Sequence, residues 1–375
     1  MSNNNCRLLS FDGGGMKGLF SAYFMKYFCQ DAGIPGNEIY KHFDIISGTS
    51  IGGIQALAYA KGMSPDDMID FFITKGPLIF SPPVSTLQKI NTLLYEDESF
   101  YSNTVLKQQL ANVFGTTKMF QLKTNVLITS VEVFLTNIPD VGESLSNFRP
   151  VFFSNVNLPG FEGQNYLIQD VALATSAAPL YFPAVTIPEV TTPNAKFIDG
   201  GTYMNNTAAG IWALSNAIHP SSDRVSLLSV GTGLGTIGLF DPQPVPPPTK
   251  VMLHHEEYKE FLATKGYTNT EINDILKSIV PDFGNVYLLL DLVSLEITGP
   301  QEAINKQLQL QALYGSKINN KDLFYYRFNT VFDPTKDTEL DSTTPEFLAY
   351  MQQAAQEQYS KDRLKIASFI QKLNF

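Results

Sequence analysis

The stretch CRLLSFDGGGMKG (residues 6–18) joins an apolar run to a glycine-rich loop, and IISGTSIGG (45–53) repeats this order further along the chain. In both stretches the apolar run predicts a buried strand, the glycines predict a tight turn, and the residues that follow predict a helix. A repeated order of strand, glycine-rich turn and helix is typical of an α/β fold. We therefore expect a mainly parallel central sheet with helices on both faces.

Other segments extend this pattern. Ser64 and Pro65 predict the start of a helix, with Asp66 and Asp67 in a first turn where the helix dipole favours acids. The segment 76–101 is expected to be irregular. The expected strands are 122–134, 148–155, 196–199, 224–230 and 322–329, and the expected helices include 17–31, 165–178 and 206–219.

The run FDPQPVPPPT (240–249) predicts a stiff, extended loop. Residues 250–375 have mainly helical periodicity. We expect a single domain over residues 1–375, with a core at about 5–235, this loop, and a helical C-terminal part at 250–375. A boundary between two domains at the proline-rich loop is the alternative.

The chain has 375 residues and a formal net charge of −10. Such an acidic chain lacks the basic surface that nucleic acid binding requires, and it has no strong attraction to anionic lipid. Any membrane contact is therefore expected to depend on apolar side chains. Cys6 and Cys29 are predicted to be buried thiols, and no metal-ligand spacing is present.

The sequence shows no targeting segment. MSNNN (1–5) has neither the basic nor the apolar region of a secretory signal. The apolar run VYLLLDLVSL (286–295) is short and contains Asp291, so it predicts a buried helix and not a membrane span. We expect a cytoplasmic or peripheral membrane protein.

The glycine loop has two interpretations. Gly13, Gly15 and Gly18 match the G-x-G-x-x-G fingerprint of dinucleotide-binding proteins, between a strand and a helix. That fingerprint expects an acid at the end of the second strand, whereas Asp44 precedes it, and Lys17 lacks the spacing of a P-loop lysine. In the other interpretation, the loop amides stabilise a charge that forms only during a reaction.

Gly48-Thr49-Ser50-Ile51-Gly52 matches G-x-S-x-G between a strand and a helix. In such a nucleophile elbow, flanking glycines allow a turn so tight that the serine projects from it, at a helix N-terminus that favours negative charge. The alternative is a simple turn that begins a helix. With a nucleophilic Ser50, the amides of Gly13, Gly14 and Gly15 are candidates for an oxyanion hole.

A nucleophilic serine needs a base. The four histidines are predicted to lie before the second strand (His42), at a helix end (His219) and on a solvated face (His254, His255). A triad of Ser50, Asp199 and His254 remains one alternative. Asp199 begins Asp199-Gly200-Gly201 at a strand end; partial burial would make it a useful base, but the same residues also suit a plain Asp-Gly turn.

Taken together, DGGGMKG (12–18), GTSIGG (48–53) and DGG (199–201) resemble the motifs of the patatin-like phospholipase family. ATSAAPLYFP (174–183) and SVGTG (229–233) add to a resemblance that covers about residues 5–235. It implies a modified α/β-hydrolase-like fold and a lipid acyl hydrolase of phospholipase A type, with a Ser–Asp dyad and no catalytic histidine. No metal or organic cofactor is implied, and the implied partner is a phospholipid or other acyl lipid at a membrane or micelle surface.

By this resemblance Ser50 is the nucleophile, Asp199 the base, and Gly13, Gly14 and Gly15 the oxyanion hole. The motif-supporting residues are Asp12, Lys17, Gly18, Gly48, Gly52, Gly200 and Gly201.

The chain departs from the family pattern at two places. Lys17 stands where arginine is commoner, which leaves headgroup preference open because lysine lacks the planar fork of arginine. Asn205-Asn206-Thr207 stands where Asn-Pro is often found, a change expected to matter little at a helix start.

Two questions stay open at this level. The apolar residues Phe71, Phe72, Leu78, Ile79 and Phe80 suit either a lid or interfacial contact, or the core. The alternative function is a patatin-like binding or partner-gated module with weak intrinsic turnover, for which an activating protein of unknown identity is a candidate partner.

Overall fold

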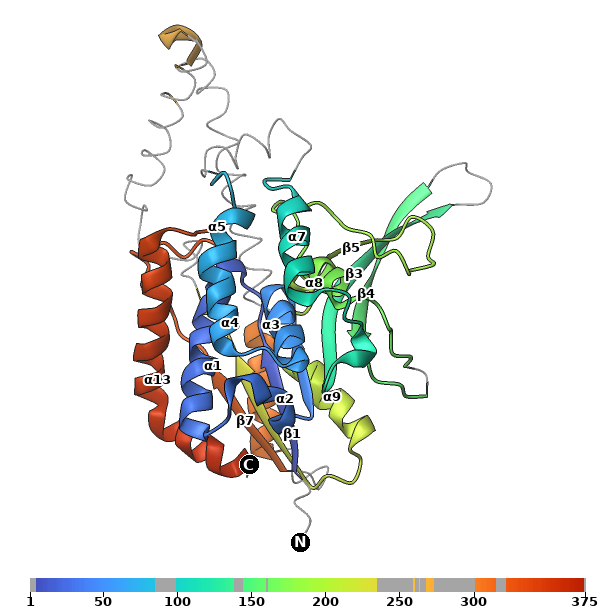
Figure 1. Ribbon diagram of the computed structural model, residues 1–375, viewed down its shortest axis with the longest axis vertical. Helices are drawn as coiled ribbons and strands as arrows, with labels where there is room; N and C mark the ends of the chain where they lie inside the picture. Colours follow the sequence, from blue (N-terminus) through green and yellow to red (C-terminus); the bar gives the residue numbers. More distant parts are fainter. Residues whose placement is uncertain are drawn as a thin grey trace.

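The computed structural model describes residues 5–84, 99–137, 144–159, 161–234, 259, 263, 268–272, 301–314 and 322–373, and its centre is a seven-stranded sheet (Figure 1). The strand order is β4-β3-β2-β1-β6-β7, and β5 pairs with β3. The strands are β1 Asn5–Phe11, β2 Ile45–Gly48, β3 Asn125–Asn137, β4 Ser144–Ser154, β5 Lys196–Asp199, β6 Arg224–Val230 and β7 Asp322–Phe328.

The sheet is mainly parallel, as predicted. β1 pairs in parallel with β2 and β6, β2 with β3, and β6 with β7. Only the pairs of β3 with β4 and with β5 are antiparallel among the described strands. Because the carboxyl ends of the parallel strands meet at one edge, the loops after β1, β2 and β6 lie together there.

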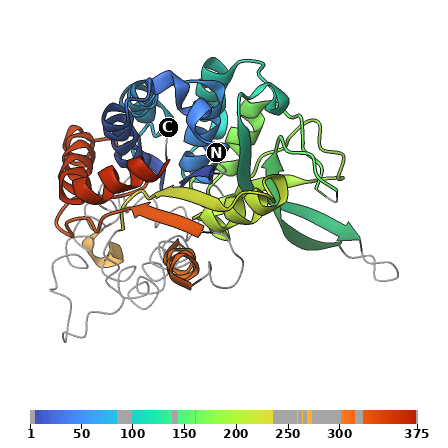
Figure 2. The same ribbon diagram turned by 90° about the horizontal axis from the view of Figure 1, so that it is seen from below.

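Helices cover both faces of the sheet (Figure 2). Along β1, Leu9 and Phe11 belong to a large buried apolar cluster on the side of α1 and α3, while Cys6 and Leu8 face a smaller cluster on the side of α9. The helices are α1 Gly18–Ala32, α2 Ile39–His42, α3 Ser50–Lys61, α4 Pro65–Asp70, α5 Gly76–Ile79, α7 Asn103–Phe114, α8 Ile168–Thr175, α9 Ala208–Ile218 and α13 Pro345–Leu373, with a further helix at 301–314 and a π-helix at Phe71–Lys75.

Local signals in the sequence account for several element ends. Ser64 caps α4 in a capping box with Asp67, as its Ser-Pro start predicts. The helix expected to reach residue 178 ends instead at Thr175. The reason is tertiary: the carbonyl of Ala177 accepts a hydrogen bond from the N–H of Asp199 at 2.9 Å, so the chain has already left the helix to meet β5.

Other predictions have mixed outcomes. Cys6 and Cys29 are buried free thiols, which confirms that prediction. The segment 76–101, expected to be irregular, contains the short helix α5 in its described part. The proline-rich loop 240–249 and the run 286–295 lie outside the described residues. Among the described residues, no helix combines the length and apolar character that a membrane span requires.

The C-terminal residues complete the sheet and cover α1. β7 adds a parallel strand beside β6, and α13 lies alongside α1 (Figure 1). The ring of Tyr359 on α13 contacts Phe24 and Tyr27 on α1 at centroid distances of 5.7 and 5.5 Å. The single-domain arrangement over the whole chain stays a prediction, because much of 235–300 is not described.

Candidate active site

Ser50 lies at the turn between β2 and α3 in a strained backbone conformation. Its φ is 54°, in the left-handed region that residues other than glycine rarely adopt. The turn is also too tight for side chains beside it, because a Cβ on Gly48 would lie 2.2 Å from the carbonyl oxygen of Gly52. The N–H of Ser50 donates to Thr175 Oγ1 at 2.9 Å. This is the geometry of a nucleophile elbow.

The glycine loop after β1 packs directly against this elbow. A Cβ on Gly13 would lie 3.0 Å from the Cβ of Ser50, and a Cβ on Gly52 would lie 2.5 Å from the carbonyl oxygen of Asp12. Gly15 has a φ of +57°, and a Cβ there would lie 2.2 Å from the carbonyl oxygen of Leu340. The loop thus needs glycine for close approach on both sides.

The loop amides differ in what they bind. The N–H of Gly13 donates to the carbonyl of Asn205 at 3.3 Å, so this amide already has an acceptor, whereas the sequence made all three glycine amides candidates for the oxyanion hole. Within the described residues, the amides of Gly14 and Gly15 have no hydrogen-bond acceptor. Both residues line the same pocket as Ser50.

Asp199 reaches this place by an antiparallel route. The last residue of β2, Gly48, pairs with Ile128 of β3, and β3 continues beyond this point. β5 pairs in the antiparallel direction with this further part of β3, which places Asp199 opposite Ser130. Asp199 is buried, and its Oδ1 accepts a hydrogen bond from the N–H of Gly201 at 2.7 Å. The sequence reveals the strand end but not this direction.

Burial raises the pKa of Asp199 to about 7, while hydrogen bonding from Ser50 and from the N–H of Gly201 acts to lower it. The turn after Asp199 packs closely on β3, since a Cβ on Gly200 would lie 2.4 Å from Thr129 Oγ1. A carboxylate with a pKa near neutral accepts a proton far more readily than an exposed one.

The two described histidines lie away from this arrangement. His42 ends α2, before β2, and His219 follows the end of α9. Neither lines the pocket. His254 and His255 lie outside the described residues, so the alternative triad with His254 stays untested.

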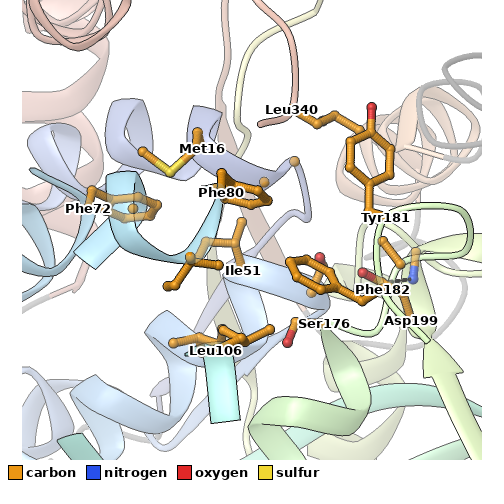
Figure 3. A pocket seen from close by; sticks show the side chains of 18 of the residues that line it. Met16, Ile51, Phe72, Phe80, Leu106, Ser176, Tyr181, Phe182, Asp199 and Leu340 are labelled. Atoms are coloured by element: carbon orange, nitrogen blue, oxygen red, sulfur yellow. Dashed lines mark hydrogen bonds between the residues drawn. The ribbon is translucent and has the colours of Figure 1, made fainter. Parts of the chain in front are cut away.

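Ser50 and Asp199 both line an apolar pocket of about 130 Å³. Figure 3 shows Asp199 together with the apolar side chains of this pocket. Four of the five apolar residues singled out in the sequence line it and are buried, while Leu78 is exposed. These four are Phe71, Phe72, Ile79 and Phe80; further lining comes from Met16, Ile51, Ile54, Leu106, Tyr181, Phe182 and Leu340. This lining suits a hydrocarbon chain, and its described residues include no Lys or Arg side chain that could bind the phosphates of a dinucleotide.

Lys17 does not line the pocket. The side chain of Lys17 is partly exposed. Loss of solvent around its ammonium lowers the pKa of that group to about 8, and the negative charge of Glu339 opposes this shift. Gly18 brings α1 close to the elbow, because a Cβ there would lie 2.9 Å from Ile51 Cγ1. No group of three or more His, Cys, Asp or Glu side chains in the described part of the chain could hold a metal ion.

Arg327 on β7 is a buried partner of the site that sequence reasoning missed. Its Nη2 lies 2.5 Å from Asp12 Oδ2 and its Nη1 3.2 Å from Asp12 Oδ1; Nη1 also donates to Ser229 Oγ at 2.8 Å. Burial raises the pKa of Asp12, and the Arg327 guanidinium opposes that rise. The lone charge within the apolar run LFYYRF was the available signal.

The segment Asn205-Asn206-Thr207, expected to be a minor change at a helix start, is instead a fully buried junction. Asn206 Oδ1 accepts a hydrogen bond from the N–H of Ala208 at 3.0 Å. Thr207 Oγ1 lies 3.0 Å from Ser10 Oγ on β1 and 2.7 Å from Ser47 Oγ on β2. It therefore joins the two strands that carry the loop and the elbow.

A family model described as patatin-like phospholipase matches residues 9–212, more than half of the chain. The chain belongs to the patatin-like phospholipase family. This confirms the resemblance found in its motifs and, with the sheet described above, the predicted fold class. The roles of the individual residues in the patatin-like site stay predictions.

Among curated proteins, the chain is similar to the cGAMP-activated phospholipase of Vibrio cholerae, with 34% identity over 214 residues that cover 54% of this chain and 56% of that protein. It is 29% identical to Patatin-like protein 2 of Oryza sativa subsp. indica, covering 53% of this chain and 50% of that protein. The chain thus matches only about half the length of these patatin-like relatives.

Among solved structures, VipD from Legionella pneumophila is 14% identical with a TM-score of 0.38, covering 97% of this chain and 67% of that one. So distant a similarity supports no inference about the patatin-like site.

Proposed function

We propose that this protein is a lipid acyl hydrolase of phospholipase A type that uses Ser50 as nucleophile and Asp199 as general base. One observation carries the proposal: the buried Asp199, with a pKa of about 7, accepts a hydrogen bond from Ser50 and lines the same apolar pocket, beside the backbone amides of Gly14 and Gly15, for which the described residues offer no acceptor. Nucleophile, base and oxyanion donors together are the parts that acyl transfer requires.

In the acylation step, Ser50 Oγ attacks the ester carbonyl carbon while its proton passes to Asp199. The carbonyl oxygen gains negative charge and accepts hydrogen bonds from the amides of Gly14 and Gly15. The N-termini of α3, which begins at Ser50, and of the helical turn at Gly15–Lys17 stabilise the same charge. Collapse of this intermediate breaks the ester C–O bond, and the leaving alcohol takes the proton from Asp199.

In the deacylation step, water attacks the acyl-enzyme carbonyl and gives its proton to Asp199. The same two amides stabilise the second oxyanion. Expulsion of Ser50 Oγ, which recovers a proton from Asp199, releases the fatty acid. No histidine takes part in either step.

The pocket supports an acyl lipid as the substrate. Its lining is almost wholly apolar, so it favours a hydrocarbon chain, while the headgroup remains outside. Lys17, with its ammonium beside Glu339, does not line this pocket and is not assigned a contact with the substrate.

The test is fatty-acid release from mixed phospholipid vesicles by the wild-type chain, Ser50→Ala, Asp199→Asn, and a variant with His42, His219, His254 and His255 changed to Gln. We expect release by the wild type and by the folded histidine-free variant, and loss of about 10³-fold or more in both site variants. Loss of release in a histidine-free variant with unchanged circular dichroism would overturn the dyad.

A second candidate is the same hydrolase held inactive until an activator binds. It is favoured by the name of the Vibrio cholerae relative, which states activation by cGAMP. The vesicle assay should therefore be run with and without cGAMP. Release only with cGAMP would support ligand gating; equal release in both would oppose it.

A further inference from the structure

Thr232 contacts the glycine loop but is not among the residues that line the pocket. It follows the end of β6 and is fully buried, and its Oγ1 donates a hydrogen bond to the carbonyl of Gly13 at 2.7 Å. It lies outside residues 9–212, the segment that the family model matches. Thr232 does not line the pocket, so it has no contact with a substrate there.

The geometry points to a role for this bond in catalysis, which rests on the proposed hydrolase function. A trans peptide unit is planar, and its C=O and N–H point in opposite directions. The carbonyl of Gly13 and the N–H of Gly14 belong to one such unit. Because Thr232 holds the carbonyl on its own side, the N–H of Gly14 points the other way, toward the pocket that Gly14 lines.

We propose that Thr232 is a positioning residue that aims the Gly14 N–H at the oxyanion. Thr232 itself is held firmly. The N–H of Gly231 donates to the carbonyl of Phe328 at 2.8 Å, and the N–H of Gly233 donates to Asn329 Oδ1 at 2.8 Å. The end of β7 thus fixes the residues on both sides of Thr232.

The fit between Thr232 and the loop is also close. A Cβ on Gly14 would lie 2.3 Å from Thr232 Oγ1, so the two residues are in direct contact. Asn205 Nδ2 is a second donor to the carbonyl of Gly13, but at 3.4 Å it is a much weaker one. Without the Thr232 hydroxyl the carbonyl keeps a partner, and the peptide unit gains freedom to rotate.

The experiment compares Thr232→Val, which keeps the shape and removes the donor, with Thr232→Ser, which keeps the donor. Ser226→Ala is the control, since it removes a buried hydroxyl within β6 that donates to Asn5 Oδ1, at the end of the strand far from the loop. Each variant is assayed on a monomeric p-nitrophenyl ester, and the rate of Ser50 labelling by a fluorophosphonate probe is measured in parallel.

We expect Thr232→Val to lower kcat and the labelling rate by about tenfold to hundredfold, with KM within about twofold of the wild type. Thr232→Ser and Ser226→Ala should stay within about threefold. The midpoint of the pH–rate profile should not move in Thr232→Val, because Asp199 keeps its surroundings. A purely structural hydroxyl would not produce this selective loss of kcat.

The inference is overturned if folded Thr232→Val labels and turns over like the wild type, if Thr232→Ser is equally slow, or if the loss lies in KM. If Thr232→Val does not fold, Thr232→Cys replaces it, since a thiol is a weak donor of similar size. A wild type that neither hydrolyses the ester nor labels at Ser50 would instead overturn the proposed function, and this inference with it.

Discussion

Asp199 shows how burial changes the chemistry of a single residue. In water an aspartate has a pKa near 3.9 and is a poor base. In this site burial raises the pKa to about 7, against the opposing hydrogen bonds from Ser50 and Gly201. Under the proposed mechanism, the same carboxylate therefore makes both the rate and the stability of the protein depend on pH.

The rate should depend on the ionised form of Asp199. We expect kcat/KM for ester hydrolysis to fall about tenfold per pH unit below pH 7 and to level off above it, because only the carboxylate accepts the Ser50 proton. The measurement is a pH–rate profile on a monomeric ester from pH 5 to 9. A profile that stays flat down to pH 5 would show that the base is not a carboxylate with a raised pKa.

Whereas kcat/KM should rise with pH, the free energy of unfolding should fall as pH rises. The pKa of Asp199 is raised in the folded state, so the unfolded chain loses this proton first, and folding becomes less favourable as pH rises from about 4 to about 7. Asp199→Asn removes that cost. We expect the variant to be more stable than the wild type by about 2–4 kcal/mol at pH 8, with a smaller difference at pH 5.

Urea unfolding of both proteins at pH 5, 6, 7 and 8 checks this prediction. Ser50→Ala serves as a control, since it leaves the carboxylate in place and should keep a pH dependence like that of the wild type. A stability difference for Asp199→Asn that is constant across this range would contradict a raised pKa.

At the scale of elements, the glycine loop after β1 is held by strands distant in sequence. β7 supplies Arg327, which pairs with Asp12 at the start of the loop. The end of β6 supplies Thr232, and the segment before α13 supplies the carbonyl of Leu340, which accepts the N–H of Met16 at 2.7 Å. Contacts with the C-terminal part of the chain therefore fix the orientation of the loop amides.

The buried pair of Asp12 and Arg327 should be costly to break from one side. Arg327→Met leaves a buried carboxylate without its partner, which we expect to cost about 3–5 kcal/mol of unfolding free energy. The double variant Asp12→Asn/Arg327→Met should lose less than Arg327→Met alone, because no buried charge remains. Urea unfolding of the single and double variants gives both values.

Lys26→Met is the control for this cycle. It breaks the exposed ion pair of Lys26 with Asp66, whose N–O distance is 2.7 Å, and should change stability by less than about 1 kcal/mol. An additive double variant of Asp12 and Arg327 would contradict the coupling of the two charges.

For the whole molecule, the family-matched residues and the C-terminal residues pack together in both apolar clusters. Phe328 on β7 stacks on Phe24 of α1 at a centroid distance of 3.9 Å and on Phe20 at 5.1 Å. The other face of β7 and the helix at 301–314 contribute Leu323 and Leu308 to the smaller core (Figure 2). Residues 9–212 thus depend on elements outside the matched segment for the burial of α1.

We expect a chain that ends at residue 320 not to fold cooperatively. It lacks β7 and α13, so it exposes the apolar face of α1 and leaves β6 as an unpaired edge. The measurement compares thermal unfolding and binding of an apolar dye for this chain and the full chain. A soluble shortened chain with a sharp unfolding transition and no dye binding would contradict this.

The sequence alone determined the fold class and the elbow at Ser50, because these follow from local signals: apolar runs, glycines at turns, and motifs with short, fixed spacing. For Asp199 the local pattern left a base and a plain Asp-Gly turn both open, and the role implied by the family resemblance stays a prediction. Even so, the motifs gave no reason to distinguish the amides of Gly13, Gly14 and Gly15 as candidate oxyanion donors. Only the tertiary structure separated them, since the carbonyl of Asn205 takes the N–H of Gly13.

The antiparallel direction of β5, the pairing of Asp12 with Arg327 and the contact of Thr232 with the loop were likewise decided by tertiary structure. So was the raised pKa of Asp199. The physical reason is common to all of them. Burial and pairing between residues up to 315 positions apart depend on which strands become neighbours, and no local pattern in the chain encodes that.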